Sequence, residues 1–272
     1  MAQPKTKRNL KWLLPLLVGL LSCLLCLLCL LPLLPHLKPS APTQTTAPAP
    51  PPPPYENIRF TYDDRGFLTS DDIACVPGID VSYYQGAIDW AAVKAAGVEF
   101  AMIRLGYRSY RDGLLHTDPR AQENLRGAKA AGLKIGAYFF SQATSAAQAR
   151  EEAQYALEIL GDTALDLPLA YDWEYVNEDA PSAQVTGPVL EQCVRSFCDA
   201  VTQAGYESML YFNQDLAKTR LDLDNLQQYP FWLAWYADQL TFSREIRLWQ
   251  YSDKGRVPGI EGNVDLNLYF PA

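Results

Sequence analysis

The sequence predicts an α/β protein, a distorted (β/α) TIM-like barrel with reduced helices in its C-terminal half, preceded by a transmembrane helix. Compact apolar runs alternate with helical patterns from residue 76 onward, which is typical of a parallel sheet covered by helices. These apolar runs number eight, as in a closed barrel. A separate apolar stretch near the N-terminus is long enough to cross a bilayer.

The first 54 residues differ in composition from the rest of the 272-residue chain. They hold five basic residues, no acidic residue and 12 of the 20 prolines. Residues 12–37 carry no Asp, Glu, Lys or Arg, so we predict a spanning helix there, after a basic cytoplasmic tail at residues 1–11. Residues 38–54 are rich in proline, a composition that favours an extended spacer.

The basic residues around the apolar stretch predict its orientation. Four precede it and Lys38 alone follows it closely, so we expect the N-terminus in the cytoplasm and the folded domain outside the cell membrane. A cleavable signal peptide would have a shorter apolar core and a small-residue cleavage site. Residues 21–23 resemble a lipoprotein cleavage site, an alternative that the apolar sequence beyond Cys23 disfavours.

The remaining 218 residues are acidic, with 31 acidic against 18 basic residues, which excludes a typical nucleic-acid binder. We expect one domain at residues 76–272, after a short lead segment at residues 55–75. The three cysteines of this part, Cys75, Cys193 and Cys198, fit no zinc spacing. We expect no disulfide framework, and we expect the last two to pack as small apolar side chains.

The elements of this domain follow from local signals. Eight strands are expected, at residues 78–83, 99–105, 134–140, 167–174, 208–212, 231–236, 247–251 and 264–269. The start and end signals of three helices are Asp118 with Pro119 and Gly132, Ser145 with Gln148 and Gly161, and Pro188 and Gly205. Beyond residue 206 the helical patterns are short or absent, and for this reason we expect a distorted barrel.

Two acidic residues end an apolar strand, where folding alone does not require them. Asp172 and Glu174 close the strand at residues 167–174, and they point to the same side because side chains alternate along a strand. Their repulsion raises the proton affinity of one, which gives the protonated and ionised pair that acid/base catalysis needs. A solvated strand end that caps a helix or binds a cation is the alternative interpretation.

Two further acids lie within other apolar strands. Asp80 taken alone is compatible with a turn former, and Asp265 taken alone with a structural hydrogen-bond acceptor. In a barrel of parallel strands, all C-terminal strand ends open at the mouth where active sites are found. We therefore expect both acids to meet Asp172 and Glu174 there.

Aromatic and polar side chains that suit sugar rings gather near the same strand ends. The substrate-binding candidates are Tyr138, Tyr211, Gln85, Arg104, Trp235, Tyr236 and Gln250. The chain has two histidines, His36 and His116, and it has no Ser-His pair and no glycine-rich phosphate loop. We therefore expect no catalytic metal.

Four segments together resemble the glycoside hydrolase family 25 lysozymes. They read DVSYYQG at residues 80–86, DWE at 172–174, WQY at 249–251 and VDLN at 264–267. The resemblance covers residues 76–270 approximately. It implies an N-acetylmuramidase that cuts the β-1,4 bond between N-acetylmuramic acid and N-acetylglucosamine in the glycan strands of peptidoglycan, without a cofactor.

The resemblance also implies roles, position by position. Glu174 matches the general acid, Asp172 matches the group that stabilises positive charge near the anomeric carbon, and Asp80 and Asp265 match the two further acids of the cleft. The resemblance implies retention of the anomeric configuration. A covalent intermediate and participation of the substrate's own acetamido group both stay open as routes.

Some positions depart from the family pattern. Tyr138 and Tyr211 match aromatic positions of the sugar site, but Tyr138 is followed by Phe139-Phe140 where many relatives have His-Phe. Arg104 stands where Lys is frequent. These departures concern the sugar subsites rather than the carboxylates.

Two other functions remain as alternatives. A family 18 chitinase also places Asp-x-Glu at a strand end, but it has a further Asp two residues earlier, where this chain has Ala170. A membrane-tethered wall-binding protein without catalysis would retain the aromatic cleft and bind glycan strands without cutting them. All four carboxylates are present, which favours the hydrolase.

Overall fold

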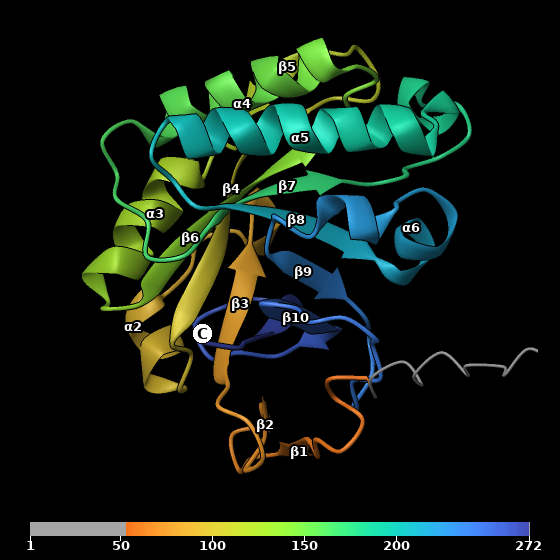
Figure 1. Cartoon of the computed structure of the whole chain (residues 1–272). Helices are drawn as coiled ribbons and strands as arrows, with labels where there is room; N and C mark the ends of the chain where they lie inside the picture. Colours follow the sequence, from red (N-terminus) through yellow and green to blue (C-terminus); the bar gives the residue numbers. More distant parts are fainter. Residues whose placement is uncertain (1–52, 272) are drawn as a thin grey trace, which may run out of the picture. The chain divides into compact units, whose positions relative to one another are not determined.

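The computed structural model describes residues 53–271, and eight strands in this part close into a barrel (Figure 1). They are β3 (Val76–Val81), β4 (Phe100–Arg108), β6 (Lys134–Ser141), β7 (Leu169–Trp173), β8 (Ser208–Asn213), β9 (Phe231–Ala234), β10 (Leu248–Gly255) and β11 (Val264–Tyr269). Hydrogen bonds join them in the order β3-β11-β10-β9-β8-β7-β6-β4, and the ladder between β4 and β3 closes the ring. The eight expected strands and the barrel are confirmed.

One barrel strand runs against the others. β3, β4 and β6 to β10 are parallel to their neighbours within this group, whereas β11 is antiparallel to both β10 and β3. Only residues 256–263 connect β10 to β11, which is too short for a crossover, so the two strands form an antiparallel pair. The expectation of a wholly parallel barrel is wrong at this last strand.

Helices cover the strands of the N-terminal half of the domain and become short in its C-terminal half. They are α2 (Trp90–Ala95), α3 (Ala121–Ala130), α4 (Ala146–Leu160) and α5 (Gly187–Gln203), and Figure 1 shows α4 and α5 side by side across the outside of the sheet. After β8 the described chain has α6 (Gln214–Thr219) and a 3-10 turn (Leu223–Leu226). The reduced helices of the C-terminal half are therefore confirmed.

The expected helix ends are mostly found. The Ser145 hydroxyl accepts from the backbone N–H of Gln148 and begins α4, and Gly161 ends it with a φ of 54°. The Gln148 side chain accepts from the backbone N–H of Thr144 instead of Ser145, so only half of a capping box forms. Pro188 lies in the first turn of α5, as expected.

Apolar side chains alternate between two cores because the strands alternate. One core fills the barrel and includes Phe100, Met102, Ala170, Met209, Trp232 and Leu248. The other lies between the strands and the helices, where Tyr171 of β7 packs on Phe197 of α5. Cys193 and Cys198 are buried free thiols in this outer core, which confirms that they pack as small apolar side chains.

The lead segment before β3 packs on the barrel. It forms a two-stranded sheet of β1 (Thr61–Tyr62) and β2 (Leu68–Thr69), and its buried side chains are Tyr55, Phe60, Phe67 and Leu68. The Tyr55 hydroxyl donates to the carbonyl of Ile246 and accepts from the N–H of the same residue. The lead segment therefore contributes to the core of the domain.

We expect Phe60→Ala to destabilise the domain strongly. Phe60 is 3% exposed and its ring packs edge-on against Trp249 and Phe270, so truncation leaves a cavity in the core. A Phe→Ala change in a core costs about 3 to 5 kcal/mol, which lowers the Tm of a domain of this size by about 6 °C or more. Tyr62→Ala is the control, because Tyr62 is 53% exposed on the same hairpin. Equal Tm shifts for the two variants in a thermal scan would contradict the core role of the lead segment.

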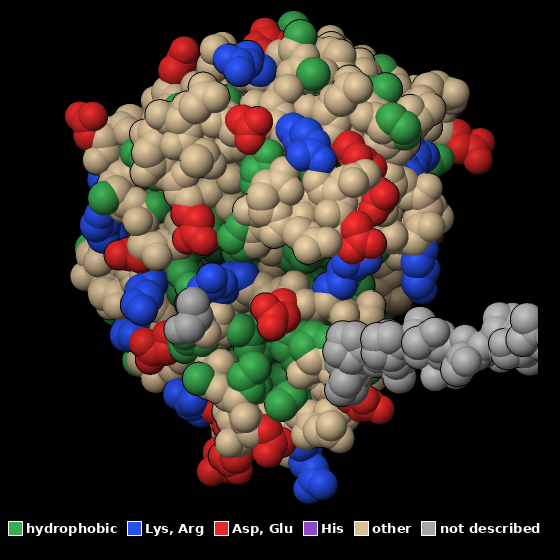
Figure 2. All heavy atoms as spheres, in the orientation of Figure 1, with side chains coloured by type: hydrophobic (Ala, Val, Ile, Leu, Met, Phe, Trp, Pro, Cys, Tyr) green, Lys and Arg blue, Asp and Glu red, His purple; other side chains and the backbone are tan. Residues whose placement is uncertain are grey.

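Charged side chains of both signs lie on the surface of the domain. On the face that Figure 2 presents, Asp and Glu side chains are spread around the molecule with Lys and Arg among them. No continuous basic patch covers the described part of this face.

The structure describes none of residues 1–52, so the expected basic tail, the expected spanning helix and all but the last two residues of the expected spacer lie outside the described part. Between residues 53 and 271, none of the helices combines the length and the hydropathy needed to cross a bilayer.

Candidate active site

A pocket of about 230 Å³ opens at the mouth of the barrel and receives side chains from every barrel strand or the turn that follows it. The lining residues are Asp80, Ser82, Tyr84, Gln85, Arg104, Tyr138, Phe140, Asp172, Glu174, Tyr211, Trp232, Tyr236, Gln250 and Asp265. Ten of the eleven site residues expected from the sequence are among them. The four acids, which are far apart in the chain, are thus brought together.

Strand alternation explains which side chains reach this pocket. On β3, β6 and β7 the lining residues occur in steps of two, at positions 80 and 82, 138 and 140, and 172 and 174. The residues between them, Val81, Phe139 and Trp173, belong to the outer core. The alternation of polar and apolar residues in the sequence therefore predicts which face of each strand carries the polar groups.

The reversed direction of β11 brings Asp265 to the mouth. Asp265 is the second residue of β11, and in the antiparallel register it lies directly opposite Asp80 of β3. In a parallel strand this early position would lie at the opposite end of the barrel, away from the pocket. The expected meeting of the acids is found, but for Asp265 the expected reason was wrong.

Asp172 and Glu174 form an acidic pair in the pocket, close enough for each carboxyl to shift the pKa of the other. Asp172 is 4% exposed, and Glu174 is half-buried and closer to the opening. The Oδ1 atom of Asp172 is buried and has no partner among the described residues. Burying an unpartnered carboxylate oxygen costs folding free energy, so this side chain does not stabilise the fold in its ionised form.

Burial raises the pKa of all four carboxyl groups. Desolvation is the largest cause at Asp172 and lifts its pKa well above the usual range, and the charge of Glu174 adds to this shift. Desolvation also raises the pKa of Glu174. At Asp80 hydrogen bonds partly offset desolvation and the pKa is about 6, whereas at Asp265 desolvation and the charge of Asp80 raise it to about 8. The pocket therefore retains protons near neutral pH, as a general acid requires.

Amide side chains hold Asp80 in place. Its Oδ2 atom accepts from Gln250 Nε2 and from Asn267 Nδ2, both at 2.8 Å. Gln250 Oε1 in turn accepts from the hydroxyls of Tyr211 and Tyr236, both at 3.2 Å. This network links the carboxyl of Asp80 to two of the tyrosines that were expected to contact sugar.

Arg104 connects the pocket to the surface beside it. Its Nε donates to Asp118 Oδ2 at 2.9 Å, and its guanidinium carbon lies 5.1, 5.3 and 5.4 Å from the ring centroids of Tyr83, Tyr84 and Tyr107. Asp118 Oδ2 also accepts from the backbone N–H of Tyr83. Asp118 was expected to cap a helix, and its Oδ1 atom accepts from the backbone N–H of Arg120 at 2.9 Å, in the turn just before α3 begins at Ala121. Its Oδ2 atom has a second role that was not expected, because it holds Arg104.

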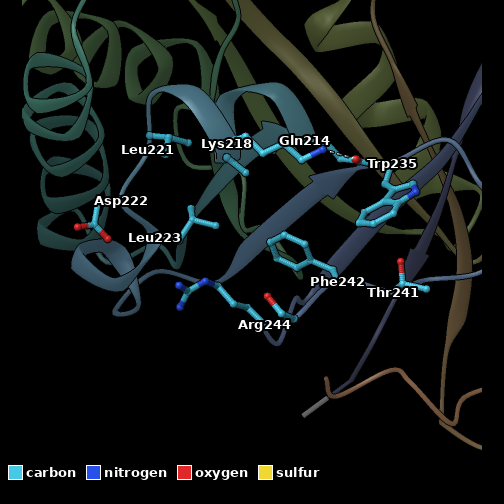
Figure 3. Close-up of a pocket in the computed structure, with 11 residues that line it drawn as sticks. Gln214, Lys218, Leu221, Asp222, Leu223, Trp235, Thr241, Phe242 and Arg244 are labelled. Carbon is cyan, nitrogen blue, oxygen red and sulfur yellow. Dashed lines mark hydrogen bonds between the residues drawn. The ribbon is translucent and has the colours of Figure 1, made fainter. Parts of the chain in front are cut away.

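Trp235 is the one expected site residue that lies elsewhere. It lines a neighbouring cavity of about 560 Å³, where Figure 3 shows it beside Phe242 and Thr241. The ring centroids of Trp235 and Phe242 are 6.4 Å apart. Ala234 belongs to the barrel core and Tyr236 to the pocket, so the residue between them faces the other way.

The sequence did not single out every lining residue. Asn267 donates a hydrogen bond to Asp80. The pocket is also lined by Ser82, Tyr84, Phe140 and Trp232. Most of these stand two residues from an expected site residue on the same strand, as Phe140 does from Tyr138 and Asn267 from Asp265. The step of two along a strand was the signal that would have found Ser82, Phe140 and Asn267, but it does not reach Tyr84 or Trp232.

We expect Asp265→Asn to stabilise the folded domain at pH 8. The pKa of about 8 lies above the ordinary 3.8, so this group favours folding when protonated, and its contribution is lost as the pH rises through about 8. Asn keeps the size of the neutral acid and does not ionise. The gain is about 2 kcal/mol after allowance for partial exposure, which raises the Tm by about 4 to 8 °C.

Thermal scans at pH 4 and pH 8 measure this effect, and Asp162→Asn is the control on an exposed turn. At pH 4 the stabilisation should largely vanish. Equal Tm changes at both pH values would contradict the raised pKa of Asp265.

The fold and the pocket define a class of protein, the barrel glycoside hydrolases that act through paired carboxyl groups. The model of the glycosyl hydrolases family 25 matches residues 79–260, which is about two thirds of the chain. The chain belongs to this family.

Known relatives agree with this family. The chain is 31% identical over 196 residues to an autolytic lysozyme of Clostridium acetobutylicum, covering 71% of this chain and 55% of the relative. It is 29% identical over 208 residues to lysozyme M1 of Streptomyces globisporus, covering 73% of this chain and 69% of the relative. The chain thus spans about half the length of the first relative.

Solved structures share the fold. The modular autolysin LytC of Streptococcus pneumoniae, in complex with a synthetic peptidoglycan ligand, has a TM-score of 0.63 at 25% identity, over 79% of this chain and 52% of that one. The bacterial lysozyme of Streptomyces coelicolor has a TM-score of 0.59 at 27% identity, over 72% of this chain and 92% of that one.

Proposed function

We propose that this protein is a muramidase that hydrolyses the β-1,4 bond between N-acetylmuramic acid and N-acetylglucosamine in peptidoglycan. The observation that carries the proposal is the meeting of Asp80, Asp172, Glu174 and Asp265 in one aromatic-lined pocket. Paired carboxyl groups are what glycoside hydrolysis needs, because one protonates the leaving oxygen while another faces the developing positive charge. The lysozyme names of the two relatives and the family support the same activity.

Glu174 is the general acid in this proposal. It is the more accessible member of the acidic pair, so its carboxyl can reach a glycosidic oxygen in the pocket. Desolvation raises the pKa of both carboxyls, so the pair retains a proton near neutral pH, and in the proposal Glu174 carries it. The catalytic proton passes from Glu174 to the glycosidic oxygen as the bond to the leaving sugar breaks.

Asp172 stabilises the transition state. Its buried Oδ1 atom has no partner among the described residues and is therefore free to face a positive charge. The oxocarbenium-like sugar supplies that charge only as the bond breaks, so Asp172 binds the transition state more strongly than the ground state. Asp80 and Asp265 complete the cleft and, with Gln250 and Arg104, offer polar groups to the sugar hydroxyl and acetamido groups.

Analysis of the cleavage products tests the proposed specificity. Purified peptidoglycan is digested with the protein, the fragments are reduced, and the reduced sugar is identified by mass spectrometry. We expect new reducing ends at muramic acid. Reducing ends at glucosamine, or release of peptides alone, would contradict a muramidase, and binding without cleavage would favour a wall-binding protein that has lost catalysis.

We propose further that residues 12–37 hold the protein at the cell membrane, with the N-terminus cytoplasmic and the catalytic domain outside. The uninterrupted apolar stretch and the basic residues before it support this proposal. A proline-rich spacer at residues 38–54 would then let the domain reach the cell's own wall. Cell fractionation checks the proposal, since a protein released into the medium with a new N-terminus would overturn it.

A further inference from the structure

A second pocket lies directly beside the catalytic one. Its volume is about 490 Å³, and Tyr84, Arg104 and Phe140 line both pockets. Its other lining residues are Tyr83, Tyr107, Arg108, Ser109, Tyr110, Arg111 and Val176. The two pockets thus share a wall, and a chain of sugars bound at the carboxyl groups can continue into the second one.

An irregularity of β4 builds this second pocket. The parallel pairing with β6 aligns Arg104 with Tyr138 but Gly106 with Phe139, so β4 has a bulge between Arg104 and Gly106. The bulge aligns Tyr107 with Phe140, so the Tyr107 side chain stands on the mouth side, over Arg104. Bulges of this kind re-aim side chains next to active sites.

A hairpin continues this wall beyond the barrel. The end of β4 pairs with β5 (Leu115–Thr117), and the turn between them carries Tyr110 and Arg111. Arg111 Nε donates to the hydroxyl of Tyr110 at 3.2 Å, so the two side chains lie together at the edge of the pocket. The hairpin is an addition to the closed barrel, which does not need it to complete the sheet.

The lining of the second pocket is cationic in an acidic domain. It contains three arginines and no Asp or Glu. Arg108 donates hydrogen bonds to the carboxylates of Glu151 and Glu152 and to the carbonyl of Gly113. Its guanidinium is therefore engaged in structural contacts.

The other two arginines keep donors free. Arg104 is 8% exposed, its Nε binds Asp118, and its Nη2 has no partner among the described residues. Arg111 has no carboxylate within ion-pair distance in the described part of the chain. The free Nη2 of Arg104 and the guanidinium of Arg111, both beside tyrosine rings, suit an anionic group carried on a sugar.

We propose that this tyrosine-arginine pocket is a subsite for a sugar of the glycan strand that carries a carboxylate, with Arg104 and Arg111 binding the carboxylate. The inference rests on the proposed muramidase function and adds a charge preference to it. Tyrosine faces pack against the sugar ring, and guanidinium forks pair with planar carboxylates. The carboxylate has two sources in peptidoglycan, the lactyl group of a muramic acid without a peptide and the carboxylates of an attached stem peptide.

The test compares three substrates. They are glycan strands freed of peptides, the same strands with their carboxylates converted to methylamides, and strands that retain their stem peptides. Initial rates give kcat/KM for the wild-type protein, for Arg111→Gln, and for Arg150→Gln, an exposed arginine on α4 outside both pockets. Gln keeps a polar side chain of similar reach and removes the charge.

We expect Arg111→Gln to lower kcat/KM on carboxylate-bearing strands about tenfold, because a hydrogen bond to a charged group is worth about 1.5 kcal/mol or more. On methylamide strands the loss should be less than about twofold. The wild-type advantage of carboxylate over methylamide strands should also shrink as salt is added. A loss confined to peptide-free strands identifies the lactyl carboxylate, and a loss on peptide-bearing strands identifies the stem peptide.

Equal losses on carboxylate and methylamide strands, or no loss at all, would overturn the proposal. The same holds if Arg150→Gln behaves as Arg111→Gln does. Binding separates this failure from failure of the muramidase function. Calorimetry with peptide-free tetrasaccharides and their methylamides measures the charge preference even if the protein cuts no substrate, and equal affinities for the two would overturn the subsite alone.

Discussion

Glu174→Gln is expected to lower the rate of peptidoglycan clearing at least about 100-fold, since general acid catalysis is worth about 10²- to 10⁴-fold. Gln keeps the shape of the side chain but has no acidic proton to give to the leaving oxygen. The fold should survive, because burial disfavours the charge that the substitution removes. Turbidity of a peptidoglycan suspension measures the rate, and circular dichroism verifies the fold.

Glu178→Gln is the matched control for this prediction. Glu178 follows Glu174 in the same connection, is exposed and does not line the pocket. Its rate should equal that of the wild type. If Glu174→Gln cleared peptidoglycan as fast as the control, Glu174 would have no part in the reaction.

Asp172→Asn is expected to lower kcat about 10²- to 10³-fold, the usual cost of losing one group that stabilises charge in a transition state. The physical reason is the position of the carboxyl, since its buried Oδ1 atom has no partner among the described residues. An amide there cannot balance the positive charge that forms on the sugar. The KM should change much less, because the charge is absent from the ground state.

The same substitution should leave the domain as stable as the wild type, or more stable, at pH 8. Burial and the charge of Glu174 hold the pKa of Asp172 well above the ordinary value, so the ionised group lowers stability as the pH rises through its raised pKa. Asp179→Asn, on an exposed loop, is the control for both measurements. Loss of stability together with activity would point to a structural role for Asp172 instead.

A substitution at a functional residue is expected to lower activity while the stability of the domain is preserved or increased. Evolution places groups there that the fold alone disfavours, such as four carboxyls with raised pKa values in one pocket. The Asp172 substitution therefore tests function and stability in opposite directions, whereas Asp265→Asn and Phe60→Ala test stability alone.

Much of the fold was predictable because its signals are local. Each barrel strand is a short apolar run, and the helix ends at Ser145 and Gly161 depend on side chains and dihedral angles within a few residues. The pair Asp172 and Glu174 was predictable for the same reason, because a spacing of two places both on one face of a strand. Trp235 shows the limit, since its aromatic character suggested a site residue but its position between Ala234 and Tyr236 directs it to another cavity.

The second pocket could not be predicted from the sequence. The bulge in β4 is a property of its pairing with β6, and nothing in the residues around Leu105 marks it. Asp118 was predicted only as a helix cap, and it makes that local contact to Arg120, but in the fold its other oxygen also binds Arg104. Both features depend on neighbours that the chain brings close only on folding.

Residues adjacent in the chain determined three features of this protein. These are the order of strands and helices, the face of each strand that carries acids, and the composition of the N-terminal segment. Tertiary structure alone decided that β11 turns back, so that an acid at its beginning lies opposite Asp80. It alone decided that burial raises the pKa values of these acids and that Arg104 faces three tyrosines. The reason is that strand direction, desolvation and side-chain contacts arise between segments distant in sequence, where no local pattern records them.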